Sequence, residues 1–337
     1  MTSIHTEDPY IAELRHRLSS DDPGVRRVAL LDFADVEDEA LLPAIVGVLR
    51  QDPDPVLRAE AARALAGWGD GDVVDALADA LADAPVVREA AAQALSELKD
   101  AVAGARLVSR ARHDDGFVYA ATLRALKELR IPAAAEPAVA ALGHADAAVR
   151  REAVGVLGWL RHAASLPRLA QLAMSDAHAE VRRTATGALG LAAPQDASGA
   201  PPLPQDLSVV LPALCAAARN EAWQVREEAA TTLGKLGPWA QAEQRAAVCA
   251  ALRDAMDDDF WQVRVRAARS LGRLRDTTAL PVLIEALAHR AGNLRKEAAI
   301  ALGEIGDARA LPALTVAAND PDPEVRKAVR LAVQRLP

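Results

Sequence analysis

The sequence predicts an all-α fold, an α-solenoid in which about ten helical hairpins of ~31 residues stack as a right-handed superhelix. Three observations predict it. Hydrophobic residues make up 51% of the chain but aromatic residues only 3%, so small and aliphatic side chains dominate the apolar content. A Val/Leu-Arg pair recurs at nearly constant spacing. The apolar residues that follow each pair have a helical period.

The recurring pair defines ten repeats. In chain order it occupies Val25-Arg26, Leu57-Arg58, Val87-Arg88, Val118-Tyr119, Val149-Arg150, Val181-Arg182, Val225-Arg226, Val263-Arg264, Leu294-Arg295 and Val325-Arg326. Successive pairs are 32, 30, 31, 31, 32, 44, 38, 31 and 31 residues apart. The first residue of each pair is called v below.

Each repeat contains two predicted helices. Apolar or small residues at v, v+4, v+7, v+8 and v+11 form one face of the first, as in 263–274. Position v+9 is glycine in five consecutive repeats: Gly158, Gly190, Gly234, Gly272 and Gly303. Position v+13 is aspartate in five repeats: Asp38, Asp70, Asp100, Asp276 and Asp307. Proline follows five residues later at Pro43, Pro281 and Pro312, so we expect these aspartates to cap the second helix.

We expect one solenoid over residues 1–337. Residues 1–20 form an N-terminal cap, and residues 320–337 form the C-terminal cap repeat. The two long steps contain insertions at 193–208, a loop rich in Pro, Gly and Ser, and near 237–245. A domain boundary at 193–208 is the weaker alternative, and the sequence leaves open whether this loop gates a groove.

The repeat resembles a known type. The pattern Asp-Pro-x-Val-Arg-x-x-Ala-x-x-Ala-Leu-Gly-x-Leu-Gly-Asp, best kept at 292–307 and 322–333, resembles the short HEAT-like repeats named after the phycobilisome (PBS) bilin lyases. The resemblance implies that the Val-Arg helix lines the concave face of the solenoid, with v−2, v−1, v+2, v+6 and v+10 outside the core. It implies the fold rather than a function, because such repeats occur in lyases, hydroxylases, DNA-repair enzymes and binding proteins.

Charge and composition limit the partners. The chain has 39 Lys and Arg against 47 Asp and Glu, a net charge of −8, which disfavours a nucleic-acid partner. We find no membrane span and no signal peptide, and two cysteines cannot form a disulfide framework. We therefore expect a cytoplasmic protein.

Departures from the repeat indicate a binding surface. The arginine at v+1 is so regular that it must serve stacking, whereas the aspartate at v+13 is lost in repeats four to seven. Aromatic residues gather there and just beyond, and repeat eight adds an arginine stripe. The candidate partner-binding residues are Phe117, Tyr119, Trp159, Trp223, Trp261, Arg266, Arg269 and Arg273. In the competing interpretation, the tryptophans are local staples and the arginines pair with Asp257, Asp258 and Asp259.

The sequence contains no recognisable catalytic or metal site. His113, His144 and His289 share position v−5, but no cysteine accompanies them. The absence of any His-Glu dipeptide excludes the iron site of deoxyhypusine hydroxylases, which resemble this fold. The P-loop, dinucleotide-binding and nucleophile-elbow motifs are also absent. We therefore expect no catalytic residues, metal or cofactor.

We predict a non-enzymatic protein-binding scaffold, an assembly or accessory factor that grips another protein on the concave face of repeats four to eight. The alternative is a bilin lyase-like or chaperone-like protein that handles a tetrapyrrole, with arginines on the propionates. A small-molecule ligand is thus compatible but less favoured. A third hypothesis, a HEAT-like DNA glycosylase, conflicts with the negative charge.

Overall fold

The computed structural model describes residues 8–192 and 204–337, which form twenty α-helices, eight short 3-10 helices and no strand. They divide into two compact units, Met1–Leu160 and Arg161–Pro337. The helices of unit 1 are α1 (Pro9–Leu18), α2 (Pro23–Val36), α3 (Leu42–Gln51), α4 (Pro55–Ala64), α5 (Gly71–Ala80), α6 (Pro85–Ser96), α7 (Ala101–Arg110), α8 (Gly116–Leu129), α9 (Ala135–Ala141) and α10 (Ala147–Trp159), with 3-10 helices η1 (Glu39–Leu41) and η2 (Pro132–Ala134).

Unit 2 has the same construction. Its helices are α11 (Leu166–Ser175), α12 (Ala179–Leu189), α13 (Pro204–Ala217), α14 (Trp223–Leu236), α15 (Ala242–Asp254), α16 (Trp261–Leu274), α17 (Leu280–Ala286), α18 (Gly292–Ile305), α19 (Leu311–Ala317) and α20 (Pro323–Arg335), with 3-10 helices η3 (Ala163–Ser165), η4 (Gly190–Ala192), η5 (Gly237–Trp239), η6 (Ala255–Asp257), η7 (Thr277–Ala279) and η8 (Ala308–Ala310).

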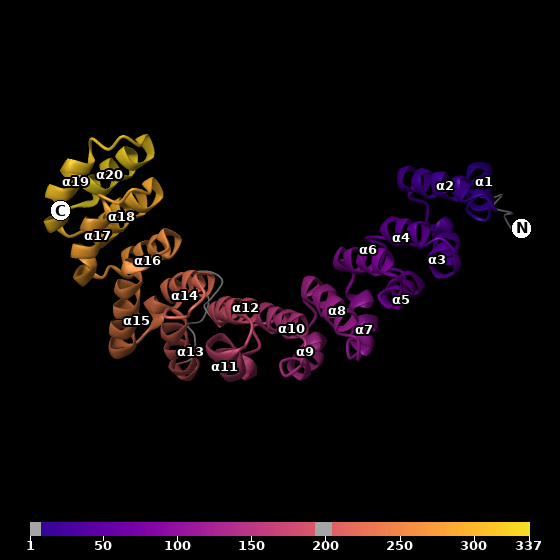
Figure 1. Ribbon diagram of the computed structural model, residues 1–337, viewed down its shortest axis with the longest axis horizontal. Coiled ribbons are helices and arrows are strands. Elements are labelled where there is room, and N and C mark those ends of the chain that lie inside the picture. Colours follow the sequence, from indigo (N-terminus) through magenta and orange to yellow (C-terminus); the bar gives the residue numbers. More distant parts are fainter. Residues whose placement is uncertain (1–7, 193–203) are drawn as a thin grey trace, which may run out of the picture. The chain divides into compact units, whose positions relative to one another are not determined.

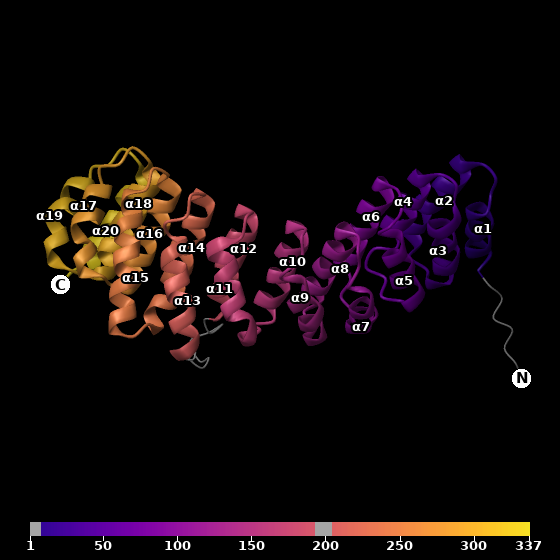
Figure 2. The same ribbon diagram turned by 60° about the horizontal axis from the view of Figure 1, so that its bottom comes forward.

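Each hairpin is an odd-numbered helix followed by an even-numbered one, so the Val-Arg helix, expected from the sequence to come first in its repeat, is the second helix of its hairpin. Within each unit, even-numbered helices pack on even-numbered helices and odd on odd, so the hairpins form two layers (Figures 1 and 2). In unit 2 the even-numbered layer lies on the inside of the curve that the helices follow (Figure 1). The predicted α-solenoid of ten hairpins is confirmed, with repeats one to five in unit 1 and six to ten in unit 2.

The predicted caps are confirmed for α5 and α7, where Asp70 and Asp100 are the N-caps, whereas Asp38, Asp276 and Asp307 cap the 3-10 helices η1, η7 and η8 that precede α3, α17 and α19. The side chains of all five v+13 aspartates accept a hydrogen bond from the backbone N–H two residues later, as Asp276 does from Thr278 at 3.1 Å. Pro43, Pro281 and Pro312 occupy the first turns of α3, α17 and α19. The proline ring fits there because those N–H groups have no intrahelical acceptor.

Glycine at v+9 brings the even-numbered helices of unit 2 close together. A Cβ on Gly303 would lie 2.6 Å from Cα of Ala332, and one on Gly272 would lie 2.7 Å from Cα of Ala301. Between α14 and α16, Ser270 Oγ donates a hydrogen bond of 2.8 Å to the carbonyl of Ala230. The even-numbered layer is therefore packed backbone to backbone, which fixes the spacing of the side chains on its outer surface.

The boundary between the two units lies at Leu160, between repeats five and six. Most of the insertion predicted at 193–208 lies outside the described residues. That residues 1–337 form one continuous solenoid stays a prediction.

Candidate functional site

The repeated arginine at v+1 is structural. Arg26 donates from Nε and Nη2 to the carboxylate of Asp52 in the next repeat, at 2.6 and 3.0 Å, and from Nη1 to the carbonyls of Ser20 and Asp21. The same fork joins Arg58 to Asp83, Arg226 to Asp258 and Arg295 to Asp320. The arginine thus ties its own loop to the next one, as the sequence analysis expected, and is not a free anion site.

The loop histidines belong to the same system. The side chain at v−5 accepts a hydrogen bond from the backbone N–H two residues later. In repeat two, Asp52 Oδ1 accepts this bond from the N–H of Asp54 at 2.9 Å. Nδ1 of His113, His144 and His289 accepts the corresponding N–H at 3.0–3.1 Å. The described residues contain no cluster of three or more His, Cys, Asp or Glu that could hold a metal ion. The histidines are turn residues.

Tyr119 is explained by the presence of histidine in place of aspartate at v−5 of the next repeat. It replaces the arginine of repeat four where His144 replaces the aspartate of repeat five, and the two rings meet edge to face, 5.7 Å between centroids. Its hydroxyl donates to the carbonyl of Pro137 at 2.9 Å, and only 5% of the residue is exposed. Burial raises the pKa of this phenol. The sequence analysis places Tyr119 on a partner surface, whereas the structure buries it, because an aromatic pair here substitutes for an ion pair.

The other two candidates of unit 1 contact arginines. Phe117 is half-buried, and the guanidinium of Arg88 lies 3.8 Å from its ring centre. Trp159, the last residue of α10, is 48% exposed, and the guanidinium of Arg130 lies 4.4 Å from its ring centre. Of Phe117, Tyr119 and Trp159, only Trp159 is an exposed residue.

In unit 2 the aromatic candidates lie at the start of α14 and α16. Trp223 stacks on Phe260, with ring centroids 5.2 Å apart and planes 12° apart. Phe260 is 41% exposed, and Trp261 beside it is half-buried. We call Trp223, Phe260 and Trp261 the aromatic cluster. Trp223 is a staple between adjacent repeats, as the competing interpretation held, and its partner Phe260 is an exposed apolar surface.

The three arginines along α16 differ in their partners within the described chain: Arg266 and Arg269 form ion pairs and Arg273 does not. Arg266 donates to Glu227 at 3.0 Å, and Arg269 forks onto Glu297 at 2.7 and 3.1 Å, which raises the pKa of Arg269. Neither contacts the aspartates at 257–259. Arg273 has no hydrogen-bond or ion-pair partner among the described residues. Trp261 and Arg273 are twelve residues apart on one helix, about 18 Å at ~1.5 Å per residue, so the expected patch of Trp261 with all three arginines does not form.

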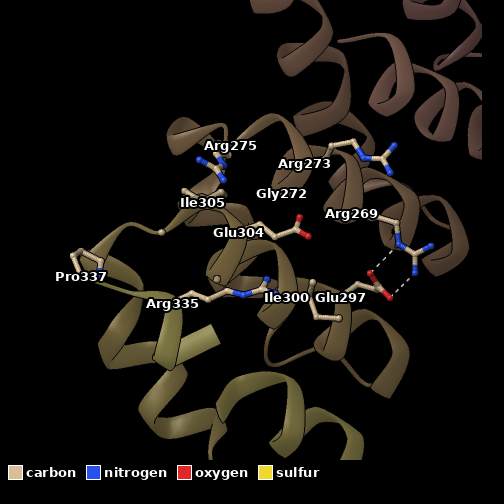
Figure 3. A pocket seen from close by; sticks show the side chains of 12 residues that line it. Arg269, Gly272, Arg273, Arg275, Glu297, Ile300, Glu304, Ile305, Arg335 and Pro337 are labelled. Atoms are coloured by element: carbon tan, nitrogen blue, oxygen red, sulfur yellow. Dashed lines mark hydrogen bonds and ion pairs between the residues drawn. The ribbon is translucent and has the colours of Figure 1, made fainter. Parts of the chain in front are cut away.

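Arg269 and Arg273 instead line a hollow of about 1030 Å³ at the C-terminal ends of α16, α18 and α20, which we call the arginine pocket (Figure 3). Its charged lining is Arg269, Arg273, Arg275, Glu297, Glu304 and Arg335. Glu304 of α18 lies between the arginines of α16 and Arg335 of α20 (Figure 3). Gly272, Gly303 and Gly306 also line the pocket.

Arg275 and Arg335 are not found from the sequence, and Phe260 belongs to the gathered aromatic residues but is not among the candidates chosen from them. Arg335 and Arg273 share position v+10 two repeats apart, so comparing one position across repeats could have found Arg335. Arg275 occupies v+12, where the chain leaves the helix in a left-handed conformation at Glu37, Arg130, Arg161, Arg275 and Gly306. No sequence signal marked this position, since only one of the five is glycine.

The two cysteines are poor nucleophiles. Both thiols are free, and burial raises the pKa of Cys215 and Cys249. Among the helices of the described residues, none combines the length and the apolar character that crossing a membrane requires.

A family described as HEAT repeats matches residues 11–96, 42–127, 104–190, 169–259 and 249–334. No curated protein sequence matches the chain. Among solved structures, an engineered protein is similar over 96% of this chain and 98% of its own, at 21% identity and a TM-score of 0.56. YibA of Escherichia coli covers 98% and 97%, at 16% identity and a TM-score of 0.52.

A structure of Kap95p with RanGDP is similar over 97% of this chain but 48% of its own chain, at 15% identity and a TM-score of 0.62. The chain therefore spans about half the length of that solenoid. At these identities the likeness concerns the fold alone.

Proposed function

Because the chain belongs to the HEAT-repeat family, we propose that it is a non-enzymatic scaffold that binds another protein on the even-numbered layer of unit 2. The aromatic cluster is the observation that carries this proposal. Phe260 stacks on Trp223 and exposes apolar surface to water, which is unfavourable. Rigid aromatic groups of this kind are typical anchors of protein interfaces. Arg266 and Arg269, already oriented by Glu227 and Glu297, form a polar rim on the same helix.

The partner is proposed to be a cytoplasmic protein, consistent with two free cysteines. Phe117 and Tyr119 are engaged in internal contacts, so we leave them out of the binding surface. Trp159 is kept as a separate candidate anchor of unit 1.

The test is affinity capture from the native host with wild type and a Trp223→Ala, Trp261→Ala double variant. Trp239→Ala is the matched control, because Trp239 is 38% exposed but lies in η5, outside the aromatic cluster. We expect one protein to be retained by wild type and by the control and lost by the double variant, while its circular dichroism shows an intact fold. Undiminished capture by the folded double variant would exclude the aromatic cluster as the site.

The arginine pocket favours a second candidate, the handling of a linear tetrapyrrole, which the PBS lyase-type repeat pattern also suggests. Its arginines offer partners for propionate carboxylates. An absorption spectrum of the same eluate tests it: a coloured eluate without a protein partner would favour this function, and a colourless one would remove it.

A further inference from the structure

We propose that the arginine pocket binds an extended acidic segment of a partner protein, with carboxylates at alternate positions. This inference rests on the proposed scaffold function and adds the chemistry of the partner. It concerns a different part of the even-numbered layer, since the aromatic cluster lies at the other end of α16.

The pocket holds cations that the fold does not use. The v+1 arginines are committed to loops, and Arg269 is committed to Glu297. In contrast, the guanidinium groups of Arg273, Arg275 and Arg335 have no hydrogen-bond or ion-pair partner anywhere in the part of the chain that the structure describes. The carboxylate of Glu304 likewise has no such partner in that part of the chain. The pKa of Arg269 is raised mainly by its hydrogen bond to Glu297, and the negative charges of Glu297 and Glu304 raise it further. The three free arginines with Glu304 carry two net positive charges.

The charged residues are unevenly divided between the two units, and the excess of cations lies in unit 2, which contains the pocket. Unit 1 contains 27 Asp and Glu against 17 Lys and Arg, whereas unit 2 contains 20 against 22. The acidic character of the protein thus belongs to unit 1, and unit 2 can attract an anionic partner. Two carboxylates would balance the two net charges of the pocket.

The geometry selects a segment over a compact anion such as phosphate. The arginines stand on α16 and α20, two helix spacings of ~8–10 Å apart, with the carboxylate of Glu304 between them (Figure 3). The helix C-termini at this end also carry partial negative charge, which opposes a concentrated dianion. In an extended peptide the side chains on one face recur every ~6.6 Å, so carboxylates four or six residues apart, at ~13–20 Å, can reach the two edges and avoid Glu304.

Arg275 is held in an unfavourable conformation. Its φ of 52° lies in the left-handed region, where glycine stands at the equivalent position of the next repeat, Gly306 with φ 72°. A side chain there is strained, and the guanidinium of Arg275 has no hydrogen-bond or ion-pair partner among the described residues to offset the strain. Replacing Arg275 with glycine should therefore separate binding from folding.

The experiment measures fluorescence anisotropy of a labelled decapeptide of alternating Glu and Ala, titrated with the full-length chain. The matched peptide has Gln in place of Glu. The pocket variant is Arg273→Gln, Arg275→Gln, Arg335→Gln. The control variant is Arg183→Gln, Arg290→Gln, Arg330→Gln, which removes three exposed charges of unit 2 outside the pocket.

We expect the pocket variant to bind the Glu peptide at least tenfold more weakly and the control variant to lose less than threefold. The Gln peptide should not bind, and raising NaCl from 50 to 500 mM should weaken wild type but not the pocket variant. Arg275→Gly should weaken binding while leaving the melting temperature unchanged or higher, a result that a structural role for Arg275 would not give.

Equal loss in the two triple variants would show that net charge alone binds the peptide and would overturn the proposal. Displacement of the peptide by an equal concentration of inorganic phosphate would assign the pocket to a small anion instead. Self-association of wild type in sedimentation, lost in the pocket variant, would make a second copy the occupant. The Trp223→Ala, Trp261→Ala variant should bind the Glu peptide normally, so failure of the aromatic cluster and failure of the pocket are observed separately.

Discussion

At the scale of single residues, a repeated arginine decides how one hairpin follows the next. Arg295 and Asp320 illustrate the contact, with side chains only 13% and 6% exposed and two hydrogen bonds of 2.7 and 2.8 Å. The hydrogen bond from Arg295 is the main cause that holds the pKa of Asp320 below its ordinary value. A buried fork of this kind is destabilising to break, since it leaves one charge without a partner.

Replacing Arg295 with Gln should lower the free energy of unfolding by ~3 kcal/mol, because the buried Asp320 loses its partner. Arg219→Gln is the control, since Arg219 and Asp254 form an ion pair that is 63% and 62% exposed, and exposed pairs contribute ~0–1 kcal/mol. Urea denaturation measures both. Equal losses would contradict a structural role for the v+1 arginine.

His289, at v−5 of repeat nine, gives its loop a pH-dependent turn. Burial lowers the pKa of His289, and the charges of Arg264, Arg290 and Arg295 lower it further. The folded state therefore holds the neutral ring, whose Nδ1 accepts the N–H of Ala291. A lowered folded pKa contributes stability that is complete above the unfolded pKa of about 6.5 and is lost as the pH falls through the folded value.

His289→Asn should remove this pH dependence, because an amide at v−5 can accept the same N–H, as Asn220 does from Ala222 at 3.1 Å. We expect wild type to lose stability relative to the variant as the pH falls below about 6.5, and the two curves to run parallel above pH 7. Thermal melts across this range measure the difference. Parallel curves throughout would show that His289 does not titrate with folding.

At the scale of elements, close approach of the even-numbered helices governs the spacing of the binding surface. Gly272 and Gly303 permit it, because the backbones of α18 and α20 occupy the place of a Cβ. Much of this was predictable. The helical period, the v+13 caps and the v+9 glycines are local patterns that ten repeats display many times over.

Gly272→Ala should destabilise the protein by ~1–3 kcal/mol, because the new methyl group would lie 2.7 Å from Cα of Ala301 and the helices must separate. Gly47→Ala in α3 is the matched control: nothing lies within 4 Å of its added Cβ, and alanine should stabilise the helix by roughly 0.5–1 kcal/mol. Opposite signs in the two denaturation midpoints are the expected result. Destabilisation by both would argue against close approach as the reason for glycine at v+9.

The candidate site was less predictable, for a physical reason. Exposure at v−2 and v+10 follows from the helical period, which located Trp223, Trp261 and Arg273. What each side chain contacts depends on a residue one or two repeats away: Glu227 engages Arg266, and Phe260 covers Trp223. A single repeat does not contain this information, so Tyr119 was placed outside the core and Arg335 was overlooked.

At the scale of the whole molecule, the two units share one construction but differ in charge and in surface. Unit 1 carries the acidic excess, and its Phe117 and Trp159 contact arginines. Unit 2 carries the aromatic cluster and the arginine pocket on one layer. The proposed partner binding uses side chains that the hairpin packing leaves free.

The central claim is that the aromatic cluster anchors a partner protein. The most direct measurement is the Kd, by calorimetry, of the captured partner for wild type, for Trp223→Ala with Trp261→Ala, and for Trp239→Ala. The account predicts that the double variant binds about thirtyfold or more weakly, a loss of ~2 kcal/mol or more, whereas Trp239→Ala stays within threefold of wild type. A folded double variant with the Kd of wild type would contradict it.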